Sequence, residues 1–178
     1  MGVWKMIIKK LYAKIISYKT NGTKPVLRDL NDIKYIVIHN TGNKGDTARN
    51  NAMYFHTTNT REAGAHYFID RKGEIYKSCK MQWIAWAVGG NFEKKENGSK
   101  YYGKCNNSNS VSIELCDIVD KDISPLQLEA LQKLIKNIQE KCPNAKTIIR
   151  HFDVNSKECP IRYIDEKKWK KLKNSLKG

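Results

Sequence analysis

The 178-residue chain contains no long hydrophobic run. None of its apolar stretches approaches the roughly twenty residues needed to cross a bilayer, so the sequence predicts no transmembrane segment. The N-terminus, MGVWKMIIKKLYAKII, also lacks the uninterrupted apolar region and the small-residue cleavage site of a secretory signal peptide, because lysines divide it. We therefore expect no export through the standard secretory route.

Proline and acidic residues are also scarce. The chain has 4 prolines, while 40% of its residues are hydrophobic and 10% aromatic, which excludes a disordered or low-complexity protein. It has 18 Asp and Glu against 33 Lys and Arg, giving a net charge of +15. Such a charge attracts a polyanion: a nucleic acid, an anionic membrane face or an anionic cell wall. Charge alone does not choose among them.

The five cysteines form no CxxC pair and are odd in number. This pattern fits neither a disulfide framework nor a four-cysteine zinc ribbon. We expect four of them to be reduced structural thiols, namely Cys79, Cys105, Cys116 and Cys142.

The hydrophobic periodicity predicts an α/β fold, with a single mixed central β-sheet flanked by helices. We expect a basic amphipathic helix over 3–18 and a turn-rich connector over 20–25, which together form an N-terminal segment 1–24 ahead of a domain 25–178. Within the domain we expect helices over 46–58, 124–141 and 165–176. Asp46 is expected to cap the first, and the second should start with Ser124 as N-cap, Pro125 at its first position and Gln127 closing a capping box. The predicted strands are 33–39, 65–70, 74–79, 111–116 and 147–151, and 88–110 reads as an irregular insertion.

Two histidines, His39 and His151, each end a predicted strand, and Cys159 follows His151 by eight positions. Functional sites of open α/β sheets lie at the C-terminal ends of strands. Two imidazoles and a thiolate can hold zinc tetrahedrally with one position left for water, the pattern of a catalytic site. Alternatively, Cys159 is a buried small hydrophobe and the histidines are satisfied by ordinary hydrogen bonds. The spacing leaves both interpretations open.

Five motifs follow one another along the chain: Ile36-Val-Ile-His39-Asn-Thr-Gly, Gly64-Ala-His66-Tyr-Phe-Ile-Asp, Ile84-Ala-Trp86-Ala-Val-Gly89-Gly, Ser112-Ile-Glu114-Leu-Cys and His151-(x)5-Lys157-x-Cys159-Pro160. In this order they resemble a known family, the zinc-dependent type 2 N-acetylmuramoyl-L-alanine amidases, which are related to peptidoglycan-recognition proteins. The resemblance runs from about residue 30 to 165 and looks most like clostridial and clostridial-phage endolysins and autolysins.

The resemblance implies roles for five residues. His39, His151 and Cys159 match the ligands of Zn²⁺. Glu114 matches the glutamate that acts as general base on the zinc-bound water, and Lys157 matches the lysine that stabilises the oxyanion. The alternation of the strand 111–116 also points Glu114 away from the apolar side chains of that strand.

Two positions depart from the family pattern. Some relatives have a catalytic tyrosine where this chain has Ala65, so we interpret the adjacent His66 as a wall of the site or a substrate contact, with a purely structural role as the alternative. Many relatives have Trp-His where this chain has Trp86-Ala87, which removes any role of that histidine and leaves Trp86 to pack under the site or line a sugar groove. His56 has no motif support, and we expect it on a helix surface.

The resulting hypothesis is a monomeric peptidoglycan hydrolase that cleaves the amide between N-acetylmuramic acid and L-alanine of the stem peptide. Its positive charge would concentrate it on an anionic Gram-positive wall, its site of action. Without a signal peptide, it would stay in the host cytoplasm until release, as a phage endolysin does, or be exported by a non-standard route. The alternative is a non-catalytic recognition module, although silent relatives typically lose the cysteine ligand. Nucleic-acid binding is not expected, because no reader motif is found.

Overall fold

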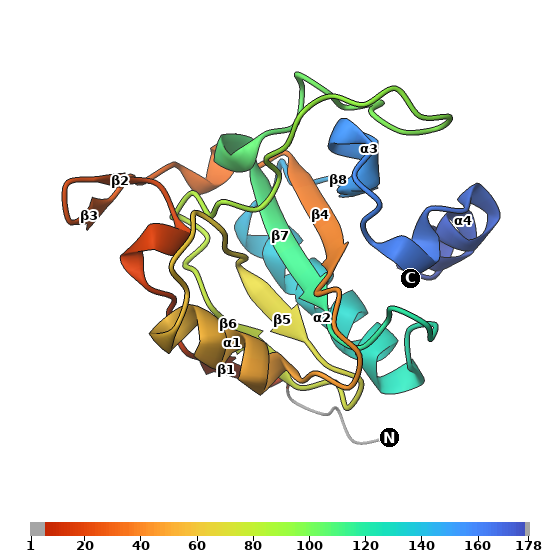
Figure 1. Cartoon of the computed structure of the whole chain (residues 1–178), viewed down its shortest axis with the longest axis horizontal. Helices are drawn as coiled ribbons and strands as arrows, with labels where there is room; N and C mark the ends of the chain where they lie inside the picture. Colours follow the sequence, from red (N-terminus) through yellow and green to blue (C-terminus); the bar gives the residue numbers. More distant parts are fainter. Residues whose placement is uncertain (1–5, 177–178) are drawn as a thin grey trace.

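The computed structural model describes residues 6–176 of the chain. Its centre is a six-stranded sheet in the order β1-β6-β5-β7-β4-β8 (Figure 1). Strands β5 and β6 pair antiparallel as a hairpin, and the other neighbours pair parallel, so the predicted mixed sheet is confirmed. The strands span Ile8–Lys10 (β1), Tyr35–Asn40 (β4), Tyr67–Ile69 (β5), Ile75–Lys77 (β6), Ser110–Leu115 (β7) and Thr147–Arg150 (β8).

Helices cover both faces of this sheet, with α1 in front and α2 behind it in Figure 1. Three of the four predicted helices are confirmed, as α1 (Ala48–Thr57), α2 (Pro125–Lys141) and α4 (Glu166–Ser175), and a one-turn helix α3 (Phe152–Asn155) was not predicted. Within residues 6–176 no helix is long and apolar enough to cross a membrane. Smaller elements are a β2–β3 pair (Thr20–Asn21, Lys24–Pro25) and 3₁₀ turns η1 (Ile15–Ser17), η2 (Leu30–Asp32), η3 (Asn107–Asn109) and η4 (Ile161–Tyr163).

The alternation of strand side chains separates a core face of the sheet from a face that holds the site. Ile38 of β4 and Ile113 of β7 belong to the main core cluster, together with the apolar stripe of α2. The neighbouring positions on the two strands, His39 and Glu114, therefore point to the opposite face, the one that α1 covers. Phe68 of β5 lies beside Glu114 in the register and packs with residues of α1.

Helix α2 begins where the sequence predicts, but one of its predicted contacts is wrong. The Ser124 hydroxyl accepts a hydrogen bond from the Gln127 backbone N–H at 3.1 Å, and Pro125 begins the helix. The Gln127 side chain does not close a capping box. It is fully buried, and its amide donates to the carbonyl oxygens of Ile69 at 2.9 Å and Cys116 at 3.0 Å, tying the helix to the ends of β5 and β7.

The helix predicted over 3–18 is wrong for the residues that the structure describes, and positions 3–5 lie outside them. The segment instead forms β1, which pairs parallel with β6 at the sheet edge. Beyond β1, the backbone N–H groups of Leu11 and Ala13 continue the pairing by donating to the carbonyls of Lys77 and Ser78. The free edge of the sheet offers backbone hydrogen bonds to this segment, and the local sequence pattern cannot reveal them. This pairing with β6 outweighs the helix that the spacing of the apolar residues predicts.

The insertion over 88–110 is irregular, as predicted, except for η3. It lies along α3: the backbone N–H groups of Ser99 and Tyr101 donate to the carbonyl oxygens of Phe152 and Asp153. The insertion therefore supports the short helix that follows His151.

Candidate metal centre and cleft

Strand pairing and one tight return of the chain bring His39, His151 and Cys159 together. Strands β4 and β8 are parallel neighbours, so His39 near the end of β4 and His151 just after β8 lie at the same edge. The single turn of α3 then ends at Ser156, which adopts a left-handed conformation (φ 64°). The chain doubles back, and the carbonyl of Cys159 accepts a hydrogen bond from the Phe152 N–H at 2.8 Å.

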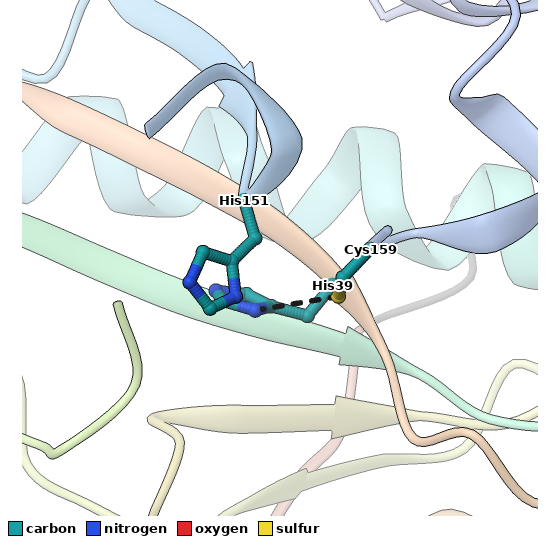
Figure 2. Close-up of side chains that lie close together, drawn as sticks. All are labelled: His39, His151 and Cys159. Carbon is teal, nitrogen blue, oxygen red and sulfur yellow. Dashed lines mark hydrogen bonds between the residues drawn. The ribbon is translucent and has the colours of Figure 1, made fainter. Parts of the chain in front are cut away.

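The three side chains point toward one another (Figure 2). Their candidate ligand atoms all lie within 4.8 Å of one another. The Sγ of Cys159 is 3.7 Å from Nδ1 of His39, and the two imidazole rings have centroids 4.8 Å apart. All three residues are buried. The convergence predicted from sequence is therefore present.

The two histidines are held in the form that binds a metal. Burial lowers the pKa of His151 to about 4 and holds that of His39 well below its usual value; the charge of Lys157 acts in the same direction on both. Both rings are therefore neutral at pH 7. The carbonyl of Gly89 lies 3.2 Å from Nε2 of His151 and accepts a hydrogen bond from the Nε2–H group, which leaves the lone pair on Nδ1. That Nδ1 is buried without a hydrogen-bond partner among residues 6–176.

Cys159 completes a donor set suited to zinc. Its Sγ accepts a hydrogen bond from the Asn40 N–H at 3.4 Å. Burial, reinforced by the charge of Glu114, raises the pKa of the thiol to about 12, so a nearby cation is needed to form the thiolate at neutral pH. Two neutral imidazoles and one thiolate are ligands typical of zinc, and three protein ligands leave the fourth tetrahedral position open. The residues present therefore fit this ion.

Glu114 lies beside this centre on the site face of β7. The register aligns it with His39 of β4 on one side and with Phe68 of β5 on the other. Its Oε2 atom is buried and has no hydrogen-bond partner in the described part of the chain. Burial raises the pKa of Glu114 to about 7; the charge of Lys157 opposes this shift and that of Asp46 adds to it. A carboxyl group with such a pKa can take up and release a proton near neutral pH.

Lys157, Glu114 and the three candidate ligands line one cleft of about 610 Å³. One wall is the exposed face of α1, including Asn50 and Tyr54, and Trp86 also lines the cleft. Lys157 is exposed at this cleft, on the return that leads to Cys159. The structure therefore brings six of the seven predicted site residues to one place.

The structure does not bring the seventh, His66, to the cleft wall. Its ring is buried, Nδ1 accepts a hydrogen bond from the Ser112 N–H at 3.1 Å, and Nε2 lies 3.1 Å from the carbonyl of Trp83. The Arg28 guanidinium is 3.0 Å from the same Nε2. Burial and the Arg28 charge lower the pKa of His66 to about 3, so its ring is neutral. These contacts favour the structural alternative for His66.

Two supporting contacts at the cleft were not predicted. Asp46, expected to cap α1, leaves that role to Thr47 and instead accepts hydrogen bonds from the Asp117 N–H at 2.7 Å and the Asn51 amide at 2.6 Å. The Gly89 carbonyl holds His151, but a backbone carbonyl leaves no signal in a sequence.

The side chains outside the site follow expectation. His56 is exposed on α1, and the other four cysteines are free and buried.

The fold and the site together define a class: a mixed α/β domain with a candidate His-His-Cys metal centre that opens into a cleft beside a half-buried carboxyl group. The sequence model of the N-acetylmuramoyl-L-alanine amidase family matches residues 29–162. The chain belongs to this family.

Curated relatives agree with this assignment. The chain is 28% identical over 167 residues to N-acetylmuramoyl-L-alanine amidase CwlL from Bacillus licheniformis, covering 89% of this chain and 43% of the relative. It is 25% identical over 172 residues to N-acetylmuramoyl-L-alanine amidase CwlA from Bacillus subtilis, covering 93% and 57%. The chain thus spans about half the length of these relatives.

Solved structures show the same fold. A mutant endolysin from Bacillus subtilis superposes with a TM-score of 0.71 at 25% identity, over 97% of this chain and 99% of that one. N-acetylmuramoyl-L-alanine amidase LysC from Clostridium intestinale has a TM-score of 0.63 at 18% identity, over 96% and 97%, which supports the fold alone. The clostridial likeness inferred from the motifs stays a prediction.

Proposed function

We propose that this chain is a peptidoglycan hydrolase that cleaves the amide between N-acetylmuramic acid and L-alanine of the stem peptide, at the cell wall. The observation that carries the proposal is the convergence of His39, His151 and Cys159 in one cleft with Glu114 and Lys157. Family membership and the printed activity of the relatives support it.

In this proposal the three ligands hold a zinc ion, Glu114 transfers the proton, and Lys157 stabilises the charge that develops in the reaction. A zinc ion in this position supplies a Lewis acid that polarises the scissile carbonyl and lowers the pKa of water. Glu114 is the general base: its half-buried carboxylate accepts the proton of the attacking water and returns it to the departing amine. The Lys157 ammonium favours the negative charge that develops on the carbonyl oxygen. Trp86 forms part of the wall along which the substrate lies.

The first prediction tests the ligands. Purified protein should carry about one zinc per chain, because two imidazoles and a thiolate complete three corners of a tetrahedron. Cys159→Ser should lower both zinc content and lysis of Gram-positive walls, since a hydroxyl is a much weaker zinc ligand than a thiolate. Metal analysis of the two proteins measures this directly. Cys79→Ser, a buried thiol outside the site, is the matched control and should keep its zinc. Full zinc content in Cys159→Ser would show that the ligand assignment is wrong.

The second prediction concerns attachment to the wall. A net charge of +15 should hold the protein on an anionic wall through many weak contacts. Binding to intact walls should therefore fall steeply as the salt concentration rises from about 0.05 to 0.5 M, because salt screens exposed charges. Cleavage of a small soluble muramyl peptide should change little over the same range. Attachment that is insensitive to salt would point to a specific wall-binding pocket instead.

A non-catalytic recognition module would give a different pair of results. It would bind the same walls but release no amine from a soluble muramyl peptide, even after loading with zinc. The intact ligand set and the carboxyl group beside it favour the hydrolase.

A further inference from the structure

The loop that follows α1 lines the cleft, and the hydrogen bonds of one buried side chain hold its backbone. Asn59 at its start is fully buried, and its side-chain amide donates to the carbonyls of Arg61 at 2.9 Å and Ala63 at 3.0 Å. Its carbonyl oxygen accepts a hydrogen bond from the Arg61 N–H at 3.2 Å. One buried side chain thus fixes the backbone on both sides of Arg61.

The C-terminal end of this loop, at Gly64, packs closely against the backbone of Ser17. A Cβ added to Gly64 would lie 2.4 Å from the carbonyl oxygen of Ser17, so only glycine allows this approach. The Gly64 N–H donates to the carbonyl of Trp86 at 2.9 Å, which ties the loop to the cleft wall. Arg61 is therefore presented to the cleft from a fixed backbone.

Arg61 is the charged residue of the cleft that has neither a partner nor an assigned role. The charges of Asp46 and Glu158 are engaged, the first by the Asn51 amide and the second by Lys95 at 3.3 Å. Glu114 and Lys157 belong to the proposed reaction. The Arg61 side chain lines the cleft, is exposed, and makes no hydrogen bond or ion pair within residues 6–176. A guanidinium held in a cleft without an internal partner is free to bind an external anion.

Arg61 shares the cleft with the proposed reaction centre without belonging to that centre. It lines the cleft together with Ala63, Gly64 and Glu114. It is neither one of the three candidate ligands nor a residue assigned to the proton and charge chemistry. Its guanidinium is therefore available to a second group of a ligand that occupies the cleft.

We propose that Arg61 is a specificity-determining residue that binds a carboxylate of the stem peptide, beyond the bond that is cleaved. This inference rests on the proposed function. A guanidinium pairs with a carboxylate through two parallel, charge-assisted hydrogen bonds, whereas a neutral carboxamide offers one acceptor oxygen. The protein should therefore prefer stem peptides in which the carboxyl group that Arg61 binds is free over peptides in which that group is amidated.

The test uses soluble muramyl tripeptides in matched pairs. In one pair the α-carboxyl of the second residue is free or amidated, and in the other pair the C-terminal carboxyl is free or amidated. The zinc-loaded protein should show about tenfold higher kcat/KM for the free acid in one of the pairs, mainly through KM. Arg61→Gln should bring this acid-to-amide ratio close to one. Arg49→Gln removes the same charge from an exposed position of α1 outside the cleft, and it should keep the wild-type ratio.

The outcomes separate the inference from the function on which it rests. Equal cleavage of acid and amide in both pairs by the wild type, or a preference that Arg61→Gln retains, would overturn the role of Arg61 and leave the hydrolase assignment intact. No cleavage of any of the four peptides by zinc-loaded protein that still binds walls would overturn the proposed function itself. A tenfold ratio that Arg61→Gln abolishes and Arg49→Gln keeps supports both.

Discussion

Glu114→Gln should lower the rate of wall lysis by about a hundredfold or more while the protein stays folded and keeps its zinc. The amide has nearly the same shape as the carboxylate but cannot accept a proton, and removal of a general base typically costs two or more orders of magnitude. Zinc should be retained because three other residues supply the ligands. Lysis assays and metal analysis of the same preparation measure both quantities.

The pH profile gives this prediction a second readout. Burial raises the pKa of Glu114 to about 7 in the metal-free protein, and a bound cation would lower it. A base works only when it is deprotonated. Wild-type activity should therefore fall as the pH drops through the pKa that Glu114 has in the zinc-loaded protein. The residual activity of Glu114→Gln should lack that acid limb, whereas Lys157→Ala, although also slow, should keep it. Near wild-type lysis by zinc-loaded Glu114→Gln would exclude Glu114 as the proton acceptor. Glu129→Gln, on the exposed face of α2, is the matched control.

Asp153→Ala should lower the free energy of unfolding by about 3–5 kcal/mol, the usual cost of removing one partner from a buried ion pair. The Arg150 side chain is completely buried. One of its guanidinium nitrogens lies 2.6 Å from Asp153 Oδ1, and the Arg150 N–H donates to Asp153 Oδ2 at 2.8 Å. Without Asp153 the guanidinium keeps Glu166 and two carbonyls as partners but loses its buried counter-charge.

Chemical denaturation in the presence of a chelator measures this loss without a contribution from bound metal. The matched control is Glu129→Ala, which removes one partner of the exposed Glu129–Lys133 pair on α2. Exposed pairs of this kind contribute up to about 0.5 kcal/mol, so the control should unfold almost like the wild type. A loss below about 1 kcal/mol in Asp153→Ala would show that the Arg150 network is not a major source of stability.

Residues with strong local signals were predicted correctly. Ser124 and Pro125 mark the start of α2 because a hydroxyl cap and a proline act within one turn of the chain. The alternation of side chains along β7 predicted that Glu114 and Ile113 point to opposite faces of the sheet, because strand geometry alone determines which face a side chain occupies. The convergence of His39 and His151 follows from strand ends, which a parallel sheet brings to one edge, whereas Cys159 reaches them through the return of the chain after α3.

Features that depend on distant partners were missed. The pairing of β1 with β6 joins residues more than sixty positions apart, and the same apolar spacing also suits an amphipathic helix. The ring of His66 bonds to the backbone of Ser112 and Trp83, contacts that no local pattern encodes. Helix α3 is one turn long, too short to be stable in isolation, and it exists because the insertion and the Arg150 network hold it.

The donor set joins segments that lie far apart in the sequence: His39 and Cys159 are 120 positions apart, yet Sγ and Nδ1 are 3.7 Å apart. A metal ion bound to both would act as a reversible cross-link that closes a loop containing most of the chain. Cross-links that close long loops restrict the unfolded chain most strongly, and a ligand that binds only the native state stabilises it in proportion to the logarithm of its concentration. The resistance of this protein to unfolding would then depend on the free metal concentration around it, so that transfer to a metal-poor medium weakens the fold as well as the proposed chemistry.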